Sequence, residues 1–138
     1  MPPRAGLVLV VDDDPSIRLV ATRILQYGGY RVTSAASVAD ALRACEAEHP
    51  DLVLCDWNMP VADGSVLLRE LLARHGTQAP PFAFVTAHHA NGELSKLEGV
   101  MAVVSKPFTM EQILGLVARF VEPRPGSVAA MKAIARAK

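Results

Sequence analysis

Carboxylate, hydroxyl and lysine side chains follow short apolar runs at four places in the chain. They are Asp12, Asp13 and Asp14 after LVLVV, Asp56 after LVLC, Thr86 after FAFV, and Lys106 after AVVS. Carboxylates within several ångströms of one another repel, so each resists ionisation unless a cation joins them. Oxygen ligands alone favour Mg²⁺. A hydroxyl and a lysine beside such an ion can hold phosphoryl oxygens, and a carboxylate can be the nucleophile that accepts the group. These residue types indicate phosphoryl acceptance if the fold brings them together.

The apolar runs themselves predict strands. We expect strands at 7–11, 30–35, 52–55, 82–85 and 102–105. The central runs lack polar alternation, which is typical of parallel strands that are buried on both faces.

Between the runs, apolar residues recur at helical spacing and predict helices that each pack one face on the sheet. The stripes are Ile17, Val20, Ala21, Ile24 and Leu25; Val38, Ala41, Leu42 and Cys45; and Ile113, Leu116, Val117 and Phe120. Helix-start signals agree with them: Asp14 before Pro15, Ser37 before Asp40, and Thr109 before Gln112. Gly28 and Gly29 are typical of a helix end. This alternation predicts an α/β doubly wound sheet, in which ligands bind beyond the carboxyl ends of the strands.

Length and composition narrow the function classes. The chain has 138 residues, which suits one domain, and its 14 basic and 14 acidic residues leave no net charge to favour nucleic-acid binding. Although 51% of the residues are hydrophobic, no apolar run approaches the roughly 18 residues of a membrane span. The two cysteines, Cys45 and Cys55, lie in apolar segments, and no signal-peptide pattern opens the chain. We expect a cytoplasmic protein with reduced thiols and no membrane insertion.

The segments VVDDDPSIR, VLCDWNMPVADG, FVTA and SKPF resemble the four motifs of the response-regulator receiver family, over about residues 7–121. The resemblance implies a flavodoxin-like sheet of five parallel strands in the order 2-1-3-4-5, with helices on both faces. It also implies a cis peptide bond between Lys106 and Pro107, and a turn at Gly64 before the third helix.

The resemblance further implies a role for each polar residue. Asp56 would be the phosphoacceptor, with Thr86 and Lys106 contacting the phosphoryl oxygens. Mg²⁺ would be held by Asp12, Asp13, Asp56 and the backbone carbonyl of Asn58. The donor would be a sensor histidine kinase or a phosphotransfer protein, and the target a downstream protein. Such a domain catalyses only its own phosphorylation and dephosphorylation, and homodimerisation is left open.

One position departs from the family pattern. Val103 stands where relatives place a switching Tyr or Phe, counting back from Lys106. A valine has one stiff side-chain torsion and too little volume to act as a lever. We therefore expect Thr86, the loop 87–92 and a short helix near 93–98 to carry the signal, and His88 to influence the lifetime of the phosphoryl group.

Other functions fit less well. A haloacid-dehalogenase-like phosphatase needs a second Asp two residues after the nucleophile, where this chain has Asn58. A receiver-like scaffold that is never phosphorylated usually lacks one of the acidic, acceptor or lysine positions, all of which are present. A nucleotide-binding flavodoxin-like protein would have a glycine-rich loop after the first strand.

We predict a receiver domain at 1–122. Residues 123–138 would be a linker with prolines and a short basic tail, either helical or disordered. A receiver fragment of a longer regulator or of a hybrid kinase is the main alternative to a stand-alone receiver.

Overall fold

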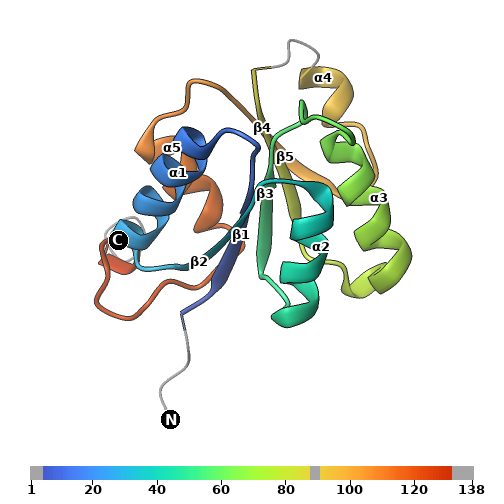
Figure 1. Cartoon of the computed structure of the whole chain (residues 1–138). Helices are drawn as coiled ribbons and strands as arrows, with labels where there is room; N and C mark the ends of the chain where they lie inside the picture. Colours follow the sequence, from blue (N-terminus) through green and yellow to red (C-terminus); the bar gives the residue numbers. More distant parts are fainter. Residues whose placement is uncertain (1–4, 88–90, 132–138) are drawn as a thin grey trace.

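Five parallel strands form the central sheet in the order β2-β1-β3-β4-β5, as expected (Figure 1). The computed structural model describes residues 5–87 and 91–131. The strands are β1 (Leu7–Val11), β2 (Arg31–Ala35), β3 (Leu52–Cys55), β4 (Phe82–Thr86) and β5 (Val100–Ser105). The predicted strands are all present, with β2 starting one residue later and β5 two residues earlier than expected.

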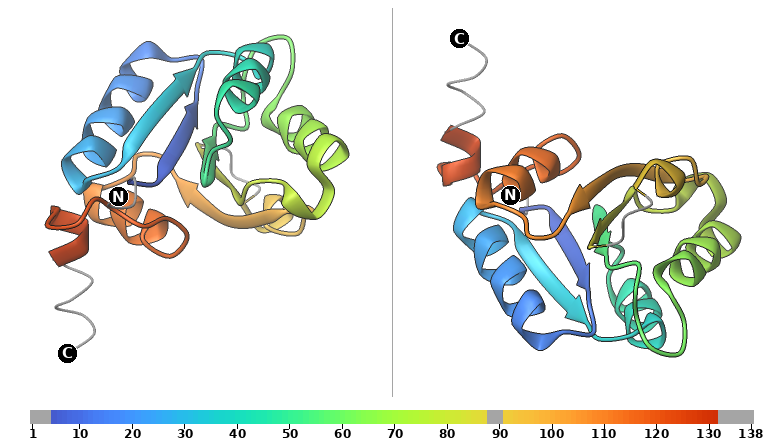
Figure 2. Two further views of the ribbon diagram at one scale, coloured as in Figure 1. Left: turned by 90° about the horizontal axis from the view of Figure 1, so that it is seen from below. Right: turned by 90° about the horizontal axis from the view of Figure 1, so that it is seen from above.

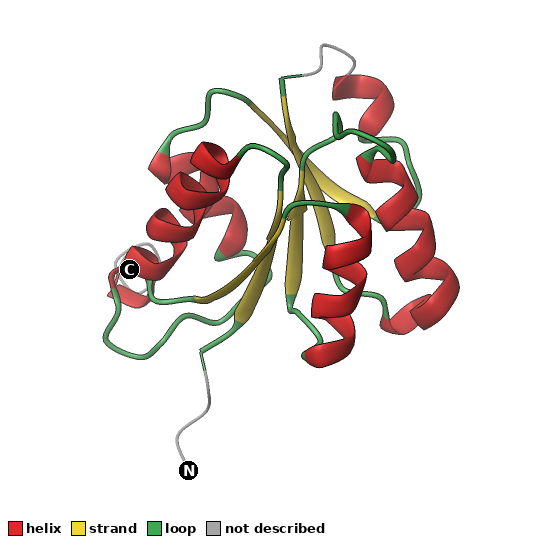
Figure 3. Cartoon of the chain, viewed as in Figure 1, coloured by secondary structure: helices red, strands yellow, loops and turns green. Residues whose placement is uncertain are grey.

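Helices cover both faces of this sheet (Figure 3). They are α1 (Pro15–Gly28), α2 (Val38–Ala47), α3 (Gly64–His75), a 3₁₀ turn η1 (Gly76–Gln78), α4 (Asn91–Leu94) and α5 (Met110–Val117). α1 and α5 lie together on one face, and α2 and α3 lie together on the other. The short helix expected near 93–98 is instead α4, which ends at Leu94 and is followed by turns.

Side-chain caps fix the helix starts. The Asp14 carboxylate accepts a hydrogen bond from the Ser16 amide, and Ser37 Oγ accepts one from the Asp40 amide. At α5 the capping box is complete, because Thr109 and Gln112 bond to each other's backbone amides. Capping satisfies amides that have no partner within the helix. These three predicted helix starts are confirmed.

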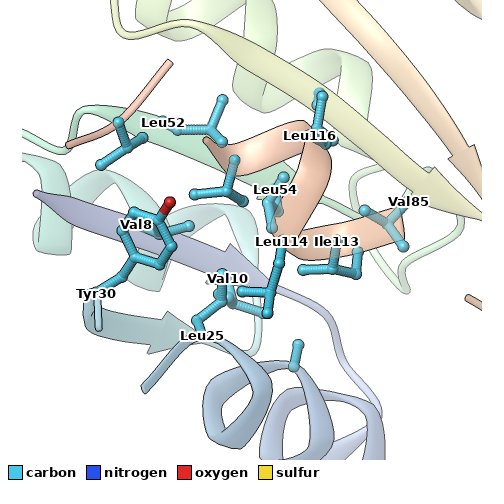
Figure 4. Packing of buried hydrophobic residues seen from close by; sticks show 14 of the residues in the cluster. Val8, Val10, Leu25, Tyr30, Leu52, Leu54, Val85, Ile113, Leu114 and Leu116 are labelled. Atoms are coloured by element: carbon cyan, nitrogen blue, oxygen red, sulfur yellow. The ribbon is translucent and has the colours of Figure 1, made fainter. Parts of the chain in front are cut away.

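The strand period of two assigns the core residues to two layers. Val8 and Val10 face α1 and α5, in a cluster that also holds Leu54 and Tyr30 (Figure 4). Leu9 and Val11 face α2 and α3, with Val53, Cys55 and Phe84. Val20 differs from the expected α1 stripe, because it is 48% exposed while the neighbouring Ala21 is buried.

The segment after α5 packs back onto the sheet edge beside α1 (Figure 2). The Arg124 amide donates to the Gly29 carbonyl oxygen over 2.8 Å, and Ser127 and Ala129 are buried. Residues 128–131 are helical. The proposed boundary at 122 remains a prediction, although the chain as far as Ala129 packs on the rest of the domain. Within the described ranges, no helix has the length and apolarity that a membrane span requires.

The packing of this segment depends on Gly29, which caps α1 with a φ of 103°. A Cβ atom at this position would lie 2.2 Å from Cβ of Ser127. Gly126 also has a positive φ, of 79°, but a Cβ atom there would meet nothing within 4 Å. Substitution of both glycines introduces backbone strain, but only a substitution at Gly29 also introduces steric overlap.

We expect Gly29→Ala to destabilise the domain more than Gly126→Ala. Gly126→Ala, the control, should lower the free energy of unfolding by about 1 kcal/mol, because alanine is strained in a left-handed backbone conformation. Gly29→Ala should cost about 2 kcal/mol more, because the overlap forces Ser127 and its segment away from α1. Urea unfolding of both variants measures the difference. Equal costs would contradict the packing described for Ser127.

Candidate functional site

The polar residues of the four segments meet where the strands end. Backbone hydrogen bonds continue one residue past the strands: the Asp56 amide donates to Val11 O over 2.9 Å, and the Lys106 amide donates to Thr86 O over 3.0 Å. The Asp12 amide likewise donates to Ala35 O over 3.1 Å. Because the strands are parallel, these extensions place the functional side chains on one rim of the sheet.

A lysine and two buried carboxylates form the centre of the site. Lys106 Nζ lies 2.7 Å from Oδ2 of Asp12 and 3.3 Å from Oδ2 of Asp56. Asp12 is only 3% exposed and Asp56 7%. Carboxylate oxygens of Asp12, Asp13 and Asp56 lie within 4.8 Å of one another, with Asp13 exposed at the rim. Three acidic groups at this separation match the oxygen-rich donor set that a hard divalent cation requires.

The burial of these charges shifts their pKa values. Burial raises the pKa of the Asp56 carboxyl; the Lys106 ammonium opposes this shift and the Asp12 carboxylate adds to it. For Lys106, burial lowers the pKa, but its bonds to Asp12 and Asp56 outweigh burial and raise the pKa overall. Lys106 therefore stays protonated, while the ionised form of Asp56 gains from any further positive charge nearby.

Backbone amides, the Arg18 guanidinium and the Cys55 thiol hold Asp12 and Asp56 in place. The Asp14 amide donates to Oδ1 of Asp12 over 2.9 Å, and Arg18 Nη1 donates to the Asp12 carbonyl over 2.7 Å. The Asn58 amide faces Oδ1 of Asp56 at 3.3 Å. The Cys55 thiol donates to the Asp56 carbonyl over 3.2 Å.

Two of these groups were not anticipated from the sequence. Arg18 lies one turn into α1, where the spacing of PSIR could have pointed to it, whereas the Cys55 contact has no sequence signal. Burial, followed by repulsion from Asp56, raises the pKa of the Cys55 thiol well above its usual range. Cys55 is thus a protonated hydrogen-bond donor and not a nucleophile.

The loop after β3 is anchored at both ends. The Trp57 ring packs edge-on against Phe84, with ring centroids 5.5 Å apart, and the Gly64 amide donates to Trp57 O over 2.9 Å. Asp63 caps α3 by accepting from the Ser65 amide, so that α3 begins at Gly64. Between these anchors, Val61 has a φ of 72° and is fully exposed.

Thr86 and Lys106 also lie at this rim. Thr86 is fully buried at the end of β4, and Ser105 ends β5 beside it in register. The peptide bond between Lys106 and Pro107 is cis, as the resemblance implied. His88 lies outside the described residues, as do residues 89 and 90 of the loop 87–92 that we expected to move.

This geometry coincides with a family match. Residues 8–118 match the family model described as the response regulator receiver domain. The chain belongs to the response-regulator receiver family. Such domains receive the signal in two-component phosphorelays, and the expected family is therefore confirmed.

Curated relatives of this receiver domain are longer proteins. It is 36% identical to the DNA-binding transcriptional regulator NtrC of Escherichia coli over 118 residues, which cover 84% of this chain and 25% of that protein. It is 34% identical to the sensor kinase CckA of Brucella abortus over 122 residues, covering 86% of this chain and 13% of that protein. The chain thus spans about a quarter or less of the length of these two relatives.

Solved receiver structures have the same fold. The chemotaxis protein CheY4 of Vibrio cholerae matches with a TM-score of 0.77 and 29% identity, covering 84% of this chain and 98% of that one. The response regulator TrrA of Thermotoga maritima, solved in complex with Mg²⁺ and BeF, matches with a TM-score of 0.74 and 28% identity, covering 83% and 97%.

Gly64 lets the start of α3 approach the end of the acceptor strand closely. A Cβ atom on Gly64 would lie 2.5 Å from the Asp56 carbonyl oxygen and 2.7 Å from the Phe84 ring. Gly115 is also a helical glycine, in α5, but a Cβ atom there would meet nothing within 4 Å. The pair tests whether the close approach of α3 to Asp56 matters.

Gly64→Ala should destabilise the domain by about 2 kcal/mol, because α3 must move away from the end of β3. Gly115→Ala should instead stabilise it by about 0.5–1 kcal/mol, since alanine loses less backbone entropy in a helix. Thermal unfolding followed by circular dichroism distinguishes the two signs. A Gly64→Ala protein as stable as the wild type would contradict the close packing of Gly64 on Asp56 described above.

Proposed function

We propose that this receiver accepts a phosphoryl group on Asp56 in a Mg²⁺-dependent reaction and, in response, changes a surface that another protein binds. The observation that carries the proposal is the Asp56 carboxylate, 7% exposed, with the Lys106 ammonium 3.3 Å away and two further carboxylates beside it. A buried carboxylate that faces a cation and an acidic cluster is suited to receive a phosphoryl group and a metal together.

In this reaction an oxygen of Asp56 attacks the phosphorus atom of the donor. The new O–P bond forms as the P–N bond of a phosphohistidine breaks, and the released imidazole takes a proton from water. Lys106 exchanges part of its pairing with Asp12 and Asp56 for the incoming phosphoryl oxygens, and the Thr86 hydroxyl donates to one of them. Mg²⁺, when bound, neutralises charge on the phosphoryl oxygens. Its ligands would be Asp12, Asp13, Asp56 and the Asn58 carbonyl.

The donor and the target follow from the same assignment. A sensor histidine kinase or a phosphotransfer protein would supply the phosphoryl group, and a downstream protein would read the result. The match to almost the whole solved chain of the chemotaxis protein CheY4 supports a stand-alone receiver. The matches to parts of a transcriptional regulator and of a sensor kinase support the receiver part of a longer regulator or hybrid kinase. The two free cysteines support a cytoplasmic location. The domain is a signalling module, and its only catalysis would be its own phosphorylation and dephosphorylation.

Phosphorylation should require Asp56 and Mg²⁺. Incubation with acetyl phosphate and Mg²⁺ should add one phosphoryl group to the wild type, and none to Asp56→Asn, in intact-mass spectra. Asp40→Asn is the matched control, because Asp40 is an exposed carboxylate on α2. EDTA should abolish the mass increase. Labelling of Asp56→Asn at the wild-type rate would rule out Asp56 as the acceptor.

Two further variants in that experiment separate the roles of neighbouring residues. Asp13→Ala should lose metal affinity together with labelling, because an exposed metal ligand is removed. Lys106→Ala should keep metal binding but slow labelling by about tenfold or more, because one charge-assisted contact to the phosphoryl group is lost. Lys96→Ala, at an exposed lysine, should behave as the wild type.

Val103 makes the transmission of the signal unusual. It pairs with Phe84 across the sheet and packs, partly buried, against the α2 and α3 layer of the core. β5 has the sequence VMAVVS, which contains no aromatic residue. Thr86 is tied to β5 through its carbonyl, which accepts from the Lys106 amide. We infer that movement of Thr86 passes to the loop 87–92 and α4, and not through the side chain at position 103.

Backbone NMR with Mg²⁺ and beryllofluoride tests this route. We expect large shift changes in residues 86–98 and small changes in the Val103 methyl groups, because valine has no second rotamer of comparable reach. Mg²⁺ alone and the Asp56→Asn protein are the controls. Changes restricted to the pocket around Asp56 would show that the distal route is absent.

A further inference from the structure

A groove lies between α2 and the loop that joins β3 to α3. Figure 1 shows where α2 and this loop lie in the fold. Its volume is about 560 Å³, and apolar side chains form most of its lining, including Val38 and Leu42 of α2, Ala62 of the loop and Val66 of α3. Because α2 and α3 both pack on the sheet, the groove is a surface feature and not a gap in the core. This volume can take several side chains of a bound partner.

Val61 forms one edge of the groove under backbone strain. A β-branched residue with a φ of 72° is an outlier, because its Cβ crowds the following carbonyl. The side chain is nevertheless fully exposed and gains nothing from burial in the domain itself. A strained residue that holds an apolar side chain in solvent beside an apolar groove indicates a contact with something outside the chain.

The charges on the groove favour a cationic partner. Its charged lining residues are Asp13, Glu70 and Arg74. Arg74 is already shared between two carboxylates, with Nη1 2.7 Å from Glu46 Oε1 and Nε 3.4 Å from Glu70 Oε2. Asp13 and the incompletely neutralised Glu70 therefore give the edges of the groove an acidic excess.

We propose that this groove binds one face of an amphipathic helix from a partner protein. Apolar side chains of that helix, at spacings of three and four residues, fill the groove against Val61 and Leu42. Lysine or arginine residues beside them meet Asp13 and Glu70. Helix-in-groove recognition uses this arrangement of apolar anchors with flanking charges.

The groove also shares Asp13 with the acidic cluster around Asp56. A cation held by Asp13 reduces the charge that attracts a basic partner, so each should weaken the binding of the other by the same factor. This coupling rests on the proposed Mg²⁺ site, whereas helix binding itself does not.

The test uses a synthetic helical peptide with leucines at i, i+3, i+4 and i+7 and flanking lysines. NMR titration of the labelled full chain should shift residues of α2 and of the loop 60–66. Val61→Asn should weaken binding about fivefold or more, since an apolar anchor is removed, while its melting temperature stays the same or rises, because asparagine tolerates a positive φ. Opposite effects on binding and stability exclude unfolding as the cause.

Further variants test the charge of the groove and the place on the domain where the peptide binds. Glu70→Gln should weaken the binding of the lysine-flanked peptide. A glutamate-flanked peptide should bind the wild type less tightly than the lysine-flanked one. Tyr27→Ala, at a 58% exposed side chain on α1, should change nothing. Shifts elsewhere on the domain, or equal binding of the two peptides, would overturn the proposal. Concentration-dependent dimerisation that Val61→Asn abolishes would also overturn it, by making a second copy of the chain the occupant.

Fluorescence of Trp57, the single tryptophan, reports Mg²⁺ binding independently. If Mg²⁺ binds to the wild type and weakens its affinity for the peptide, and has no such effect on Asp13→Ala, the coupling is supported. If Mg²⁺ binds without affecting the peptide, the coupling is wrong and the proposed function is untouched. If Mg²⁺ does not bind but the peptide still does, the proposed metal site is wrong and the proposed peptide-binding groove is supported.

Discussion

The pairing of Lys106 with Asp12 and Asp56 is the interaction on which the rest of the rim depends. Two carboxylates that are almost completely buried repel each other, and burial alone disfavours both charges. The ammonium group 2.7 Å and 3.3 Å away offsets part of that cost. It can do so because the carboxyl ends of these parallel strands meet at one rim: Val11 pairs with Cys55, and β4 and β5 continue two residues past the level of Cys55. The strand lengths, the parallel direction and the backbone hydrogen bonds beyond the strand ends are therefore requirements of the charge cluster.

Strand order explains why the acidic groups meet between β1 and β3. The chain leaves β1 toward β2 on one side, and β3, β4 and β5 follow on the other, so the connections diverge there. A crevice opens at such a switch point in doubly wound sheets. Asp12 and Asp56 stand on its two sides, and the rigid ladder bond from Asp56 to Val11 O keeps them apart at a fixed spacing. The apolar groove beside α2 extends the same crevice outward, which is why it shares Asp13 with the cluster.

Local and periodic features were predictable from the sequence, and features set by distant contacts were not. The five strands, the helix caps at Asp14, Ser37 and Thr109, and the polar residues at strand ends follow from short-range patterns. Val20 was misplaced because helical spacing alone cannot tell which edge of an apolar stripe meets a neighbour. The packing of Ser127 on Gly29 joins residues far apart in the chain. The positive φ of Val61 belongs to a local turn, in which the Ala62 amide donates to the Pro60 carbonyl, but a valine gives no signal for that conformation. The pairing of Lys106 with Asp12 spans 94 positions and had no local signal of its own.

The segment that packs on Gly29 has a practical consequence for handling the protein. Gly29 and the neighbouring Tyr30 precede β2, so this segment lies at the amino ends of the strands, opposite the rim that holds Asp56. A dye, an affinity handle or a sensor surface coupled close to residue 131 would thus be separated from Asp56 by the length of the sheet. Immobilisation through that end leaves the rim facing the solution, and real-time binding measurements can be made on the oriented domain.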